Sequence, residues 1–420
     1  MVSIPREGTP SRIDTRLHPS IPPHGAGLVI IGRMGRNVAI HGFLAAAILI
    51  LSTTSAAETS FKEMFTDPAD GAFDMSRFIK TRTGFVPILA PVTEPAVGYG
   101  IAGGVVFFHR REGEPPPNPA PAGEGRMTAP SLTAVGGFAT ENGSWGVFGG
   151  HRGVWKEDRI RYLGGLGYAD LQLTFYGTRP QTTDLSRDIE IRTVPFIQDL
   201  GVRIPGSDFF AGLRYVFVST DITFKPGRDI PGITDREWTG NSKIGGLIPY
   251  LEYDSRDNIF TPNRGVHAKA SLGFFDGIFG GDYDYRELKA KAVGYWPVLP
   301  NVVAGLRADG QFVAGDAPFY ALPFVQLRGI PAMRYQGTDV LTLETEGRWM
   351  VTPRWGLVGF AGIGKAADGF DALRDAETVW NAGGGFRYLT AREFGLQMGV
   401  DVARGPEQWA IYVVFGNSWN

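Results

Sequence analysis

Polar and apolar residues alternate along most of this chain between positions 94 and 415. Arg307 and Asp309, for example, alternate with Leu306 and Ala308. Because successive side chains of a β-strand point to opposite faces, this period of two predicts strands with one polar and one apolar face. The same alternation recurs at 266–274, 287–292, 341–349 and 396–402.

Two architectures produce such strands. A soluble β-sandwich also alternates, but its charged face looks outward, and a chain of 420 residues would need several separate cores. A membrane barrel with a polar lumen and an apolar exterior explains the pattern with a single architecture. The sequence therefore predicts an all-β fold, a transmembrane antiparallel β-barrel.

The alternating runs and the turn residues between them predict sixteen strands. An even number is expected when neighbouring strands are antiparallel and both chain ends lie on the periplasmic side. Longer surface loops are then expected at 178–188, 223–241 and 316–337, whereas the long Pro-rich connection 111–130 falls unexpectedly on the periplasmic side. The predicted strands are 84–91, 96–109, 129–141, 144–153, 158–177, 189–204, 208–222, 242–256, 264–278, 283–297, 302–315, 338–350, 355–366, 377–389, 394–403 and 408–416.

The chain begins with a segment typical of export. An apolar run at 38–51 follows Arg33 and Arg36 and precedes the small residues that end at Ala57. This order predicts a signal peptide with cleavage after Ala57. The alternative, a membrane anchor, is disfavoured because the run is shorter than the ~20 residues that span a bilayer. Met34 lies just before the second arginine, so we interpret the residues upstream of it as an over-extended start.

Three regions follow from these boundaries: 1–57 as start and signal peptide, 58–83 as a periplasmic extension, and 84–420 as an outer-membrane barrel. The extension is too short for an independent domain. Asp74 is placed to cap a short helix. The expected helix carries Phe73, Met75, Phe78 and Ile79. Two interpretations remain open, a helix that closes the base of the barrel and a loosely ordered periplasmic tail.

Composition supports export and excludes several functions. Removing the five Arg and two acidic residues of 1–57 leaves 36 basic and 41 acidic side chains, a net charge of −5, so no basic surplus indicates nucleic-acid binding. The chain has 58 Gly and 12% aromatic residues, which suits strands and interfacial girdles. It has no Cys, which is acceptable in the oxidising periplasm. Together these features predict the outer membrane of a Gram-negative bacterium.

Signatures of enzymes are weak, and we expect neither catalysis nor a cofactor. The stretch 98–103 spells a dinucleotide fingerprint but lies within an alternating strand. After the leader, only His109, His151 and His267 remain, and no nucleophile elbow is present in the sequence. A membrane hydrolase with a dispersed site remains the open alternative.

Asp254, Arg256 and Asp257 resemble an acid cluster. The sequence shows no metal-ligand spacing and no neighbouring histidine beside them. We therefore predict a charge network that closes a strand end and its turn, with no metal.

Two motifs and the end of the chain carry a family resemblance. Residues 251–265 read LEYDSRDNIFTPNRG, and residues 326–337 read QLRGIPAMRYQG, followed by the strand LTLETEGRW. The chain ends in FGNSWN. In this order and separation, the motifs resemble the BamA/TamA superfamily of sixteen-stranded outer-membrane barrels, also called the bacterial surface antigen family. The resemblance covers about residues 84 to 420.

The resemblance implies a role for each motif. The first would form a periplasmic turn, and the second would be the tip of a surface loop folded into the lumen, followed by a Glu-x-Arg strand. Gly362 departs from the family, which commonly has a lumen Asp at this place. The residues carried over are Asp254, Arg256, Asp257, Asn258, Pro262 and Gly265 for the turn; Arg328, Gly329, Glu346 and Arg348 for the loop and strand; and Phe415 and Trp419 for the terminal strand signal.

The residue chemistry of the loop motif fits a clamp. Arg328 has a planar fork that can engage a carboxylate and stays charged where water is scarce. Gly329 permits a sharp turn. Glu344 and Glu346 lie on the polar face of the next strand and are the candidate acceptors. The alternative is an ordinary exposed loop arginine.

Members of the resembled superfamily insert or export other outer-membrane proteins, receive them on periplasmic POTRA domains and template them at a weak seam between the first and last strands. This sequence leaves no room for POTRA domains. The resemblance therefore implies a short member that acts in insertion or translocation with partner proteins. Its expected partners are outer-membrane lipid, client proteins and periplasmic partners. The alternative is a transport pore or structural barrel, with Arg307, Asp309, Lys289 and Lys291 setting the charge of the lumen.

Overall fold

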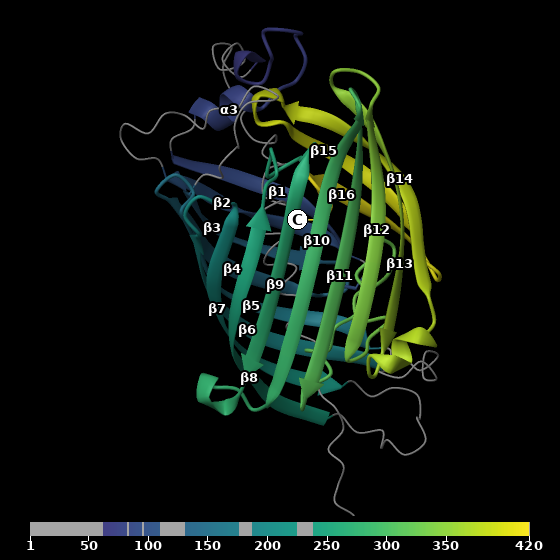
Figure 1. Ribbon diagram of the computed structural model, residues 1–420. Helices are drawn as coiled ribbons and strands as arrows, with labels where there is room; N and C mark the ends of the chain where they lie inside the picture. Colours follow the sequence, from purple (N-terminus) through teal and green to yellow (C-terminus); the bar gives the residue numbers. More distant parts are fainter. Residues whose placement is uncertain are drawn as a thin grey trace, which may run out of the picture.

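The computed structural model describes residues 62–81, 84–94, 96–109, 131–175, 187–224 and 238–419 (Figure 1). The expected signal peptide with cleavage after Ala57 lies outside the described residues. The Pro-rich connection 111–130 lies outside them as well, as do most residues of the loops 178–188 and 223–241.

Sixteen strands form one sheet in which every strand is antiparallel to its sequence neighbours, and the strand order follows the chain (Figure 1). The sheet rolls into a nearly closed barrel, so the predicted fold is confirmed. The strands are β1 (Gly84–Glu94), β2 (Gly98–His109), β3 (Ser131–Thr140), β4 (Trp145–Trp155), β5 (Ile160–Phe175), β6 (Arg187–Arg203), β7 (Phe209–Phe224), β8 (Trp238–Asp254), β9 (Gly265–Phe275), β10 (Tyr285–Leu299), β11 (Val302–Gly315), β12 (Asp339–Met350), β13 (Trp355–Ala367), β14 (Val379–Ala391), β15 (Leu396–Arg404) and β16 (Trp409–Phe415).

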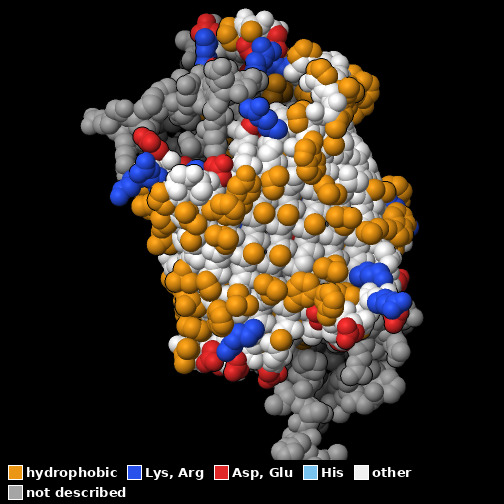
Figure 2. Space-filling view, in the orientation of Figure 1, with side chains coloured by type: hydrophobic (Ala, Val, Ile, Leu, Met, Phe, Trp, Pro, Cys, Tyr) orange, Lys and Arg blue, Asp and Glu red, His pale blue; other side chains and the backbone are white. Residues whose placement is uncertain are grey.

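The alternation of the sequence becomes the two faces of the barrel wall. On β12, Leu341 and Leu343 are exposed on the outside, whereas Glu344 and Glu346 are buried on the inside. Figure 2 shows hydrophobic side chains spread over the strand face and charged side chains gathered near its two ends. An apolar band between charged ends is the exterior that a bilayer requires. No helix in the described ranges combines the length and apolarity needed to cross a membrane.

The two ends of the barrel differ in their connections. Short turns join β4 to β5, β6 to β7, β10 to β11, and β12 to β13 at the end where β1 begins; we call this end the base, and it is uppermost in Figure 1. Longer connections lie at the opposite end, including the 23 residues 316–338 between β11 and β12. Three 3-10 helices complete the described connections: η4 (Gly277–Phe279), η5 (Asp371–Arg374) and η6 (Arg392–Phe394).

The residues before the barrel contain a short helix, α3 (Ser76–Thr81). The Asp74 carboxylate accepts a hydrogen bond from the Ser76 N–H at 2.7 Å, the interaction expected of a residue that begins a helix. Phe73 and Met75 lie before the helix and not within it. The reason is that Phe73 forms a β-bridge with Thr66, while the Met75 N–H donates to Thr390.

The barrel has one seam. β1 and β16 are the two edges of the sheet, and among the described residues no strand pairing joins them. β16 is also the shortest strand, with 7 residues against 11 in β1. The two edges nevertheless lie near one another, which is why the barrel is nearly closed.

Candidate functional site

The loop between β11 and β12, residues 316–338, folds into the lumen. It is pinned at its neck by a β-bridge between Phe324 and Gln336 and by a 2.9 Å hydrogen bond from Val325 N–H to the Tyr335 carbonyl. Its tip is buried, and the Arg328 residue is only 7% exposed. The second motif therefore lies inside the barrel, and not at a solvent-exposed loop end.

Arg328 contacts three carboxylates. Its Nε donates to Glu344 at 3.1 Å, and one terminal nitrogen donates to Glu346 at 2.9 Å and to Asp401 at 2.8 Å. The same nitrogen lies 3.3 Å from the Ser418 hydroxyl. One loop arginine thus connects β12, β15 and the end of the chain.

An aromatic ring completes the arginine site. The Arg328 guanidinium carbon lies 3.4 Å from the centre of the Phe360 ring on β13. A cation over an aromatic face is attracted by the ring quadrupole, and the attraction grows when water is excluded. The Phe360 ring therefore contacts the face of the guanidinium, while the carboxylates accept hydrogen bonds from the N–H groups at its edge.

Two further arginines balance the buried carboxylates. Arg307 on β11 donates to Glu344 at 3.2 Å, and Arg387 on β14 donates to Asp401 at 3.0 Å. Asn381 adds a 2.9 Å hydrogen bond to Glu344. Burying charge is costly unless it is paired and hydrogen-bonded, and Glu344 and Asp401 each have several donors.

Gly329 allows the tip to turn. Its φ angle is 84°, in the left-handed region that favours glycine. Its N–H donates to the Tyr412 hydroxyl at 2.9 Å, and Asn381 donates to the adjacent Arg328 carbonyl at 3.0 Å. The tip is thereby fixed to β14 and β16 by main-chain atoms as well as by charge.

Gly362 does not leave a gap in the clamp. A Cβ atom at Gly362 would lie 2.7 Å from Asn381 Oδ1 and 2.8 Å from both a Leu327 methyl carbon and the Leu343 carbonyl. Neighbouring side chains therefore fill the place that an aspartate would need. The extra acid comes from Asp401 on β15, which the sequence showed only as part of an alternating polar face.

We expect Gly362→Asp to destabilise the barrel although it restores the residue common in the resembled family. The crowded Cβ position predicts a loss of about 1–3 kcal/mol in the free energy of unfolding from overpacking. Urea unfolding in detergent would measure it, with Gly362→Ala as the smaller step. Gly359→Ala is the matched control on the same strand, because nothing lies within 4 Å of its Cβ position. A rise in stability of Gly362→Asp would contradict the crowding.

The Glu-x-Arg strand divides its two charged residues between two tasks. Glu346 binds the loop arginine, whereas Arg348 points toward the base and donates to the Pro262 carbonyl at 2.8 Å and to the Asn263 side chain at 2.5 Å. Strand β12 therefore connects the loop motif to the turn motif.

The turn motif at 254–265 is built from side chains that bind its own backbone. Asp257 accepts N–H groups of Asn263 and Arg264 at 3.0 and 3.3 Å, and Asn258 accepts two further N–H groups. Asn258 also donates to the Phe394 carbonyl at 2.8 Å, which ties the turn to η6. Gly265 has a φ angle of 101° and ends the turn.

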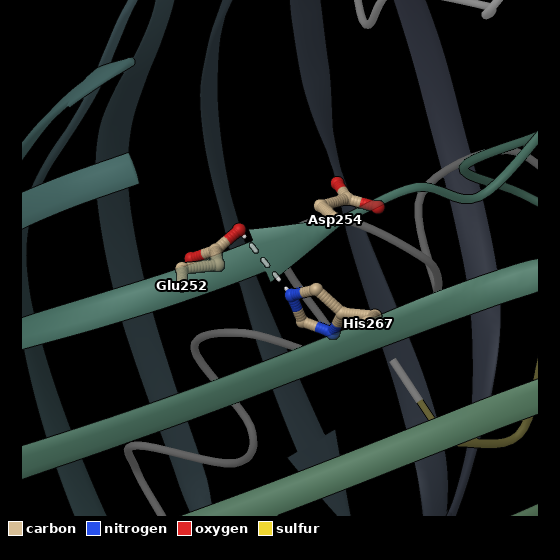
Figure 3. Close-up of side chains that lie close together, drawn as sticks. All are labelled: Glu252, Asp254 and His267. Carbon is tan, nitrogen blue, oxygen red and sulfur yellow. Dashed lines mark ion pairs between the residues drawn. The ribbon is translucent and has the colours of Figure 1, made fainter. Parts of the chain in front are cut away.

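A histidine lies beside this acid cluster, so the expectation that none neighbours it was wrong. Antiparallel pairing of β8 with β9 places His267 opposite Asp254. Its Nε2 lies 3.2 Å from Glu252, and potential ligand atoms of the three residues lie within 4.8 Å of one another (Figure 3). The spacing along the sequence did not show this proximity, which depends on strand register.

The carboxylates of Glu252 and Asp254, which lie beside His267, are already paired with positively charged side chains. Arg161 and Lys269 lie 3.1 and 3.3 Å from Glu252, and Arg256 lies 2.9 Å from Asp254. A divalent cation placed here would adjoin three positive side chains, and Coulomb repulsion opposes that. The geometry therefore favours a charge network over a metal site.

The end of the chain also enters the lumen. Phe415 ends β16, and Gly416 follows with a φ angle of 68°, so Trp419 lies beyond the strand and not in it. Trp419 is 2% exposed, packs 6.0 Å from the Tyr295 ring and donates from its indole nitrogen to Glu344 at 2.5 Å. The terminal signal thus contributes to the same network as the loop arginine.

Part of the chain matches a known protein family. Residues 162–326 match the profile of the Omp85 superfamily domain. Over this stretch the barrel is similar to the Omp85 superfamily domain. Among the described residues, which comprise the sixteen strands, part of their connections and residues 62–81, no POTRA domain is present. The predicted resemblance is therefore confirmed, although no curated protein matches the sequence.

Solved structures of BamA and CdiB share the fold at low sequence identity. A structure of BamA from Haemophilus ducreyi that lacks POTRA domains 1–3 matches with a TM-score of 0.53 and 11% identity, covering 80% of this chain and 69% of that chain. CdiB from Escherichia coli matches with a TM-score of 0.53 and 11% identity, covering 80% of this chain and 62% of that chain. CdiB from Acinetobacter baumannii matches with a TM-score of 0.50 and 8% identity, covering 79% of this chain and 59% of that chain. The match spans less than two thirds of either CdiB chain.

Proposed function

We propose that this Omp85-family barrel aids the insertion or translocation of outer-membrane proteins through its seam, together with periplasmic partner proteins. In this proposal the barrel is exported by a signal peptide ending at Ala57, is surrounded by outer-membrane lipid, binds client proteins, binds no nucleic acid and performs no enzymatic reaction. The family match supports an outer-membrane location.

The observation that carries the proposal is the edge of β1. β1 pairs with β2 without a register shift, and it contains Pro87 and Pro91, four residues apart. In an antiparallel ladder, residues two or four apart direct their backbone groups to the same side. Proline lacks an N–H and is tolerated in sheets where that group would face the free edge. The two prolines therefore fall on the seam side of β1.

Two missing donors weaken any pairing between β1 and β16. No strand in the described ranges pairs with the remaining backbone groups on this edge, and an unsatisfied group in hydrocarbon costs several kcal/mol. A strand of a client protein can satisfy them by adding to the edge, as extended peptides do at other sheet edges. The sequence of β1 thus supports a seam that is easily separated and ready to accept a strand.

The alternative role as an open pore has less support. Arg307 donates to the Gln326 carbonyl of the loop, and Lys291 donates to the Trp419 carbonyl of the tail, so both hold these segments in place. Among the charged residues proposed to line a path, Lys289 keeps 38% of its side chain accessible. These contacts keep the loop and the tail inside the lumen.

Replacing both prolines tests the proposal. In cells depleted of the native protein, we expect other outer-membrane barrels to decrease and wild-type protein to restore them. Pro87→Ala with Pro91→Ala should restore them several-fold less well, because the new donors allow β1 to pair with β16. Pro297→Ala is the matched control, an exposed strand proline on β10 away from the seam. Quantitative mass spectrometry of outer membranes provides the measurement.

Two outcomes would contradict the proposal. If depletion leaves other barrels unchanged while the purified protein conducts ions in planar bilayers, the pore interpretation replaces it. If the double variant restores barrels as well as wild type does, the seam is not the working surface.

A further inference from the structure

Residues 62–81, here called the N-terminal segment, are bound to the last strands of the barrel at its base. The segment uses its backbone and short polar side chains here, and the partners lie at the end of β14 and in η6. Three hydrogen bonds make this connection: Met75 N–H to the Thr390 carbonyl at 2.7 Å, Arg392 N–H to Asp74 at 2.9 Å, and Glu393 N–H to the Ser76 hydroxyl at 3.1 Å.

An ion cluster reinforces this attachment. Arg354, in the turn between β12 and β13, lies 2.8 Å from Asp70 and 2.6 Å from Asp74, and it also pairs with Asp67. Arg392 lies 3.1 Å from Asp67. The Arg354 side chain is only 7% exposed, so its charge depends on these acids. Three carboxylates of the segment thus share two arginines, one in the turn after β12 and one in η6 after β14.

The ion cluster stays charged at neutral pH. The hydrogen bond from Arg354 lowers the pKa of Asp70 from 3.8 to about 2. Burial alone would raise the pKa of Asp74, but hydrogen bonds from Ser76 and Arg354 outweigh it and lower that pKa. A lowered carboxyl pKa contributes stability that is complete above the ordinary value and is lost as the pH falls through the folded value. The attachment therefore weakens only in acid below about pH 4.

The other side of the segment faces the first strands. Met75 and Phe78 belong to one buried apolar cluster that includes Ile88 on β1 and Val106 on β2. Phe394 of η6 belongs to the same cluster. A single small core therefore joins the first strands to the turn that precedes β15, on both sides of the seam.

Chain connectivity completes the bridge. The segment ends at Thr81, and β1 begins three residues later at Gly84. Whatever holds the segment to the last strands therefore also holds the start of β1 near them. Because β1 and β16 are not paired with each other among the described residues, this attachment substitutes for missing pairing at the base.

We propose that residues 62–81 act as a latch that holds the base of the seam closed, and that releasing Arg354 from its acids frees β1. The latch deepens the proposed function, on which its biological use rests, because it controls the same seam. Its mechanical action can be measured without any client.

Hydrogen exchange of the purified protein in lipid nanodiscs tests the latch. In Arg354→Gln we expect amides of 84–94 and of 396–415 to exchange about tenfold faster than in wild type, with amides of β9 to β11 unchanged. Arg354→Lys should fall between the two, since it keeps the charge but not the fork. Arg192→Gln is the matched control, an ion-paired arginine whose side chain is 57% exposed on β6.

A second variant guards against failure to fold. If Arg354→Gln gives no folded band on unheated gels, the pair Asp67→Asn with Asp70→Asn weakens the same cluster through side chains that are partly exposed, 11% and 28%. If exchange becomes faster in the segment alone and stays unchanged in β1, the latch is overturned. The segment would then only plug the base of the barrel. Faster exchange at β1 with normal barrel assembly in cells would keep the latch and contradict the proposed function.

Discussion

Arg328→Ala is expected to lower the free energy of unfolding by about 3–5 kcal/mol, the cost of removing one partner from a buried ion pair. The substitution leaves Glu344, Glu346 and Asp401 in the lumen without the cation that joins them. Arg307 and Arg387 still reach two of these acids, but no other ion pair is described for Glu346 within the resolved ranges. The Arg328→Ala substitution is also expected to release the loop tip from Phe360, because it removes the guanidinium that lies over the ring.

Urea unfolding in detergent and the mobility of unheated samples on gels measure this loss. Arg328→Lys should be intermediate, because an ammonium group cannot reproduce the planar fork. Adding Glu346→Gln to Arg328→Ala should recover part of the loss by removing an uncompensated charge. Arg192→Ala serves as the control for loss of an exposed arginine. An unchanged unfolding midpoint in Arg328→Ala would show that the network is not a clamp.

Gly329→Ala is expected to have the next largest effect, about 2–3 kcal/mol, through strain at a positive φ angle and overpacking. A Cβ atom here would lie 2.8 Å from the Gly405 nitrogen and 3.0 Å from the Arg404 carbonyl carbon, which are backbone atoms that cannot simply rotate away. The loop tip must therefore shift, although every charged partner of Arg328 remains present.

Limited trypsin digestion of the folded protein gives a direct measurement of that shift. Arg328 is buried in the wild type, so cleavage after it should be slow, and it should become at least tenfold faster in Gly329→Ala. Gly359→Ala is the matched control, since its Cβ position is open. If cleavage after Arg328 is equally slow in both variants, the tip tolerates the methyl group and glycine is not required there.

The strands could be predicted well from the sequence because a barrel in lipid constrains every residue of its wall. β11 runs from Val302 to Gly315, the predicted range, and β13 differs from prediction by one residue at Ala367. A one-residue slip would turn the apolar face into the lumen and the charges into lipid. The prediction of β8 was less accurate, because this strand begins at Trp238, four residues before the predicted start.

The site could be predicted only in part, because its contacts cross the lumen. Glu344 and Glu346 lie one strand from the loop and were expected as acceptors, but Asp401 is 73 residues from Arg328 and meets it only once the barrel closes. His267 was missed for a related reason, since its proximity to Asp254 depends on the pairing of β8 with β9. Trp419 was expected to mark a strand, and the turn at Gly416 carries it inward instead.

The inward position of Trp419 has a consequence for biogenesis. The last residues of the chain supply Ser418 and Trp419 to a network that also needs the loop arginine and Glu344. Because β12 and β16 are separated by three strands in the sheet, these contacts form only once the sheet has curved enough to bring the two strands together. The interior lock is therefore a product of barrel closure and not of pairing between neighbouring strands.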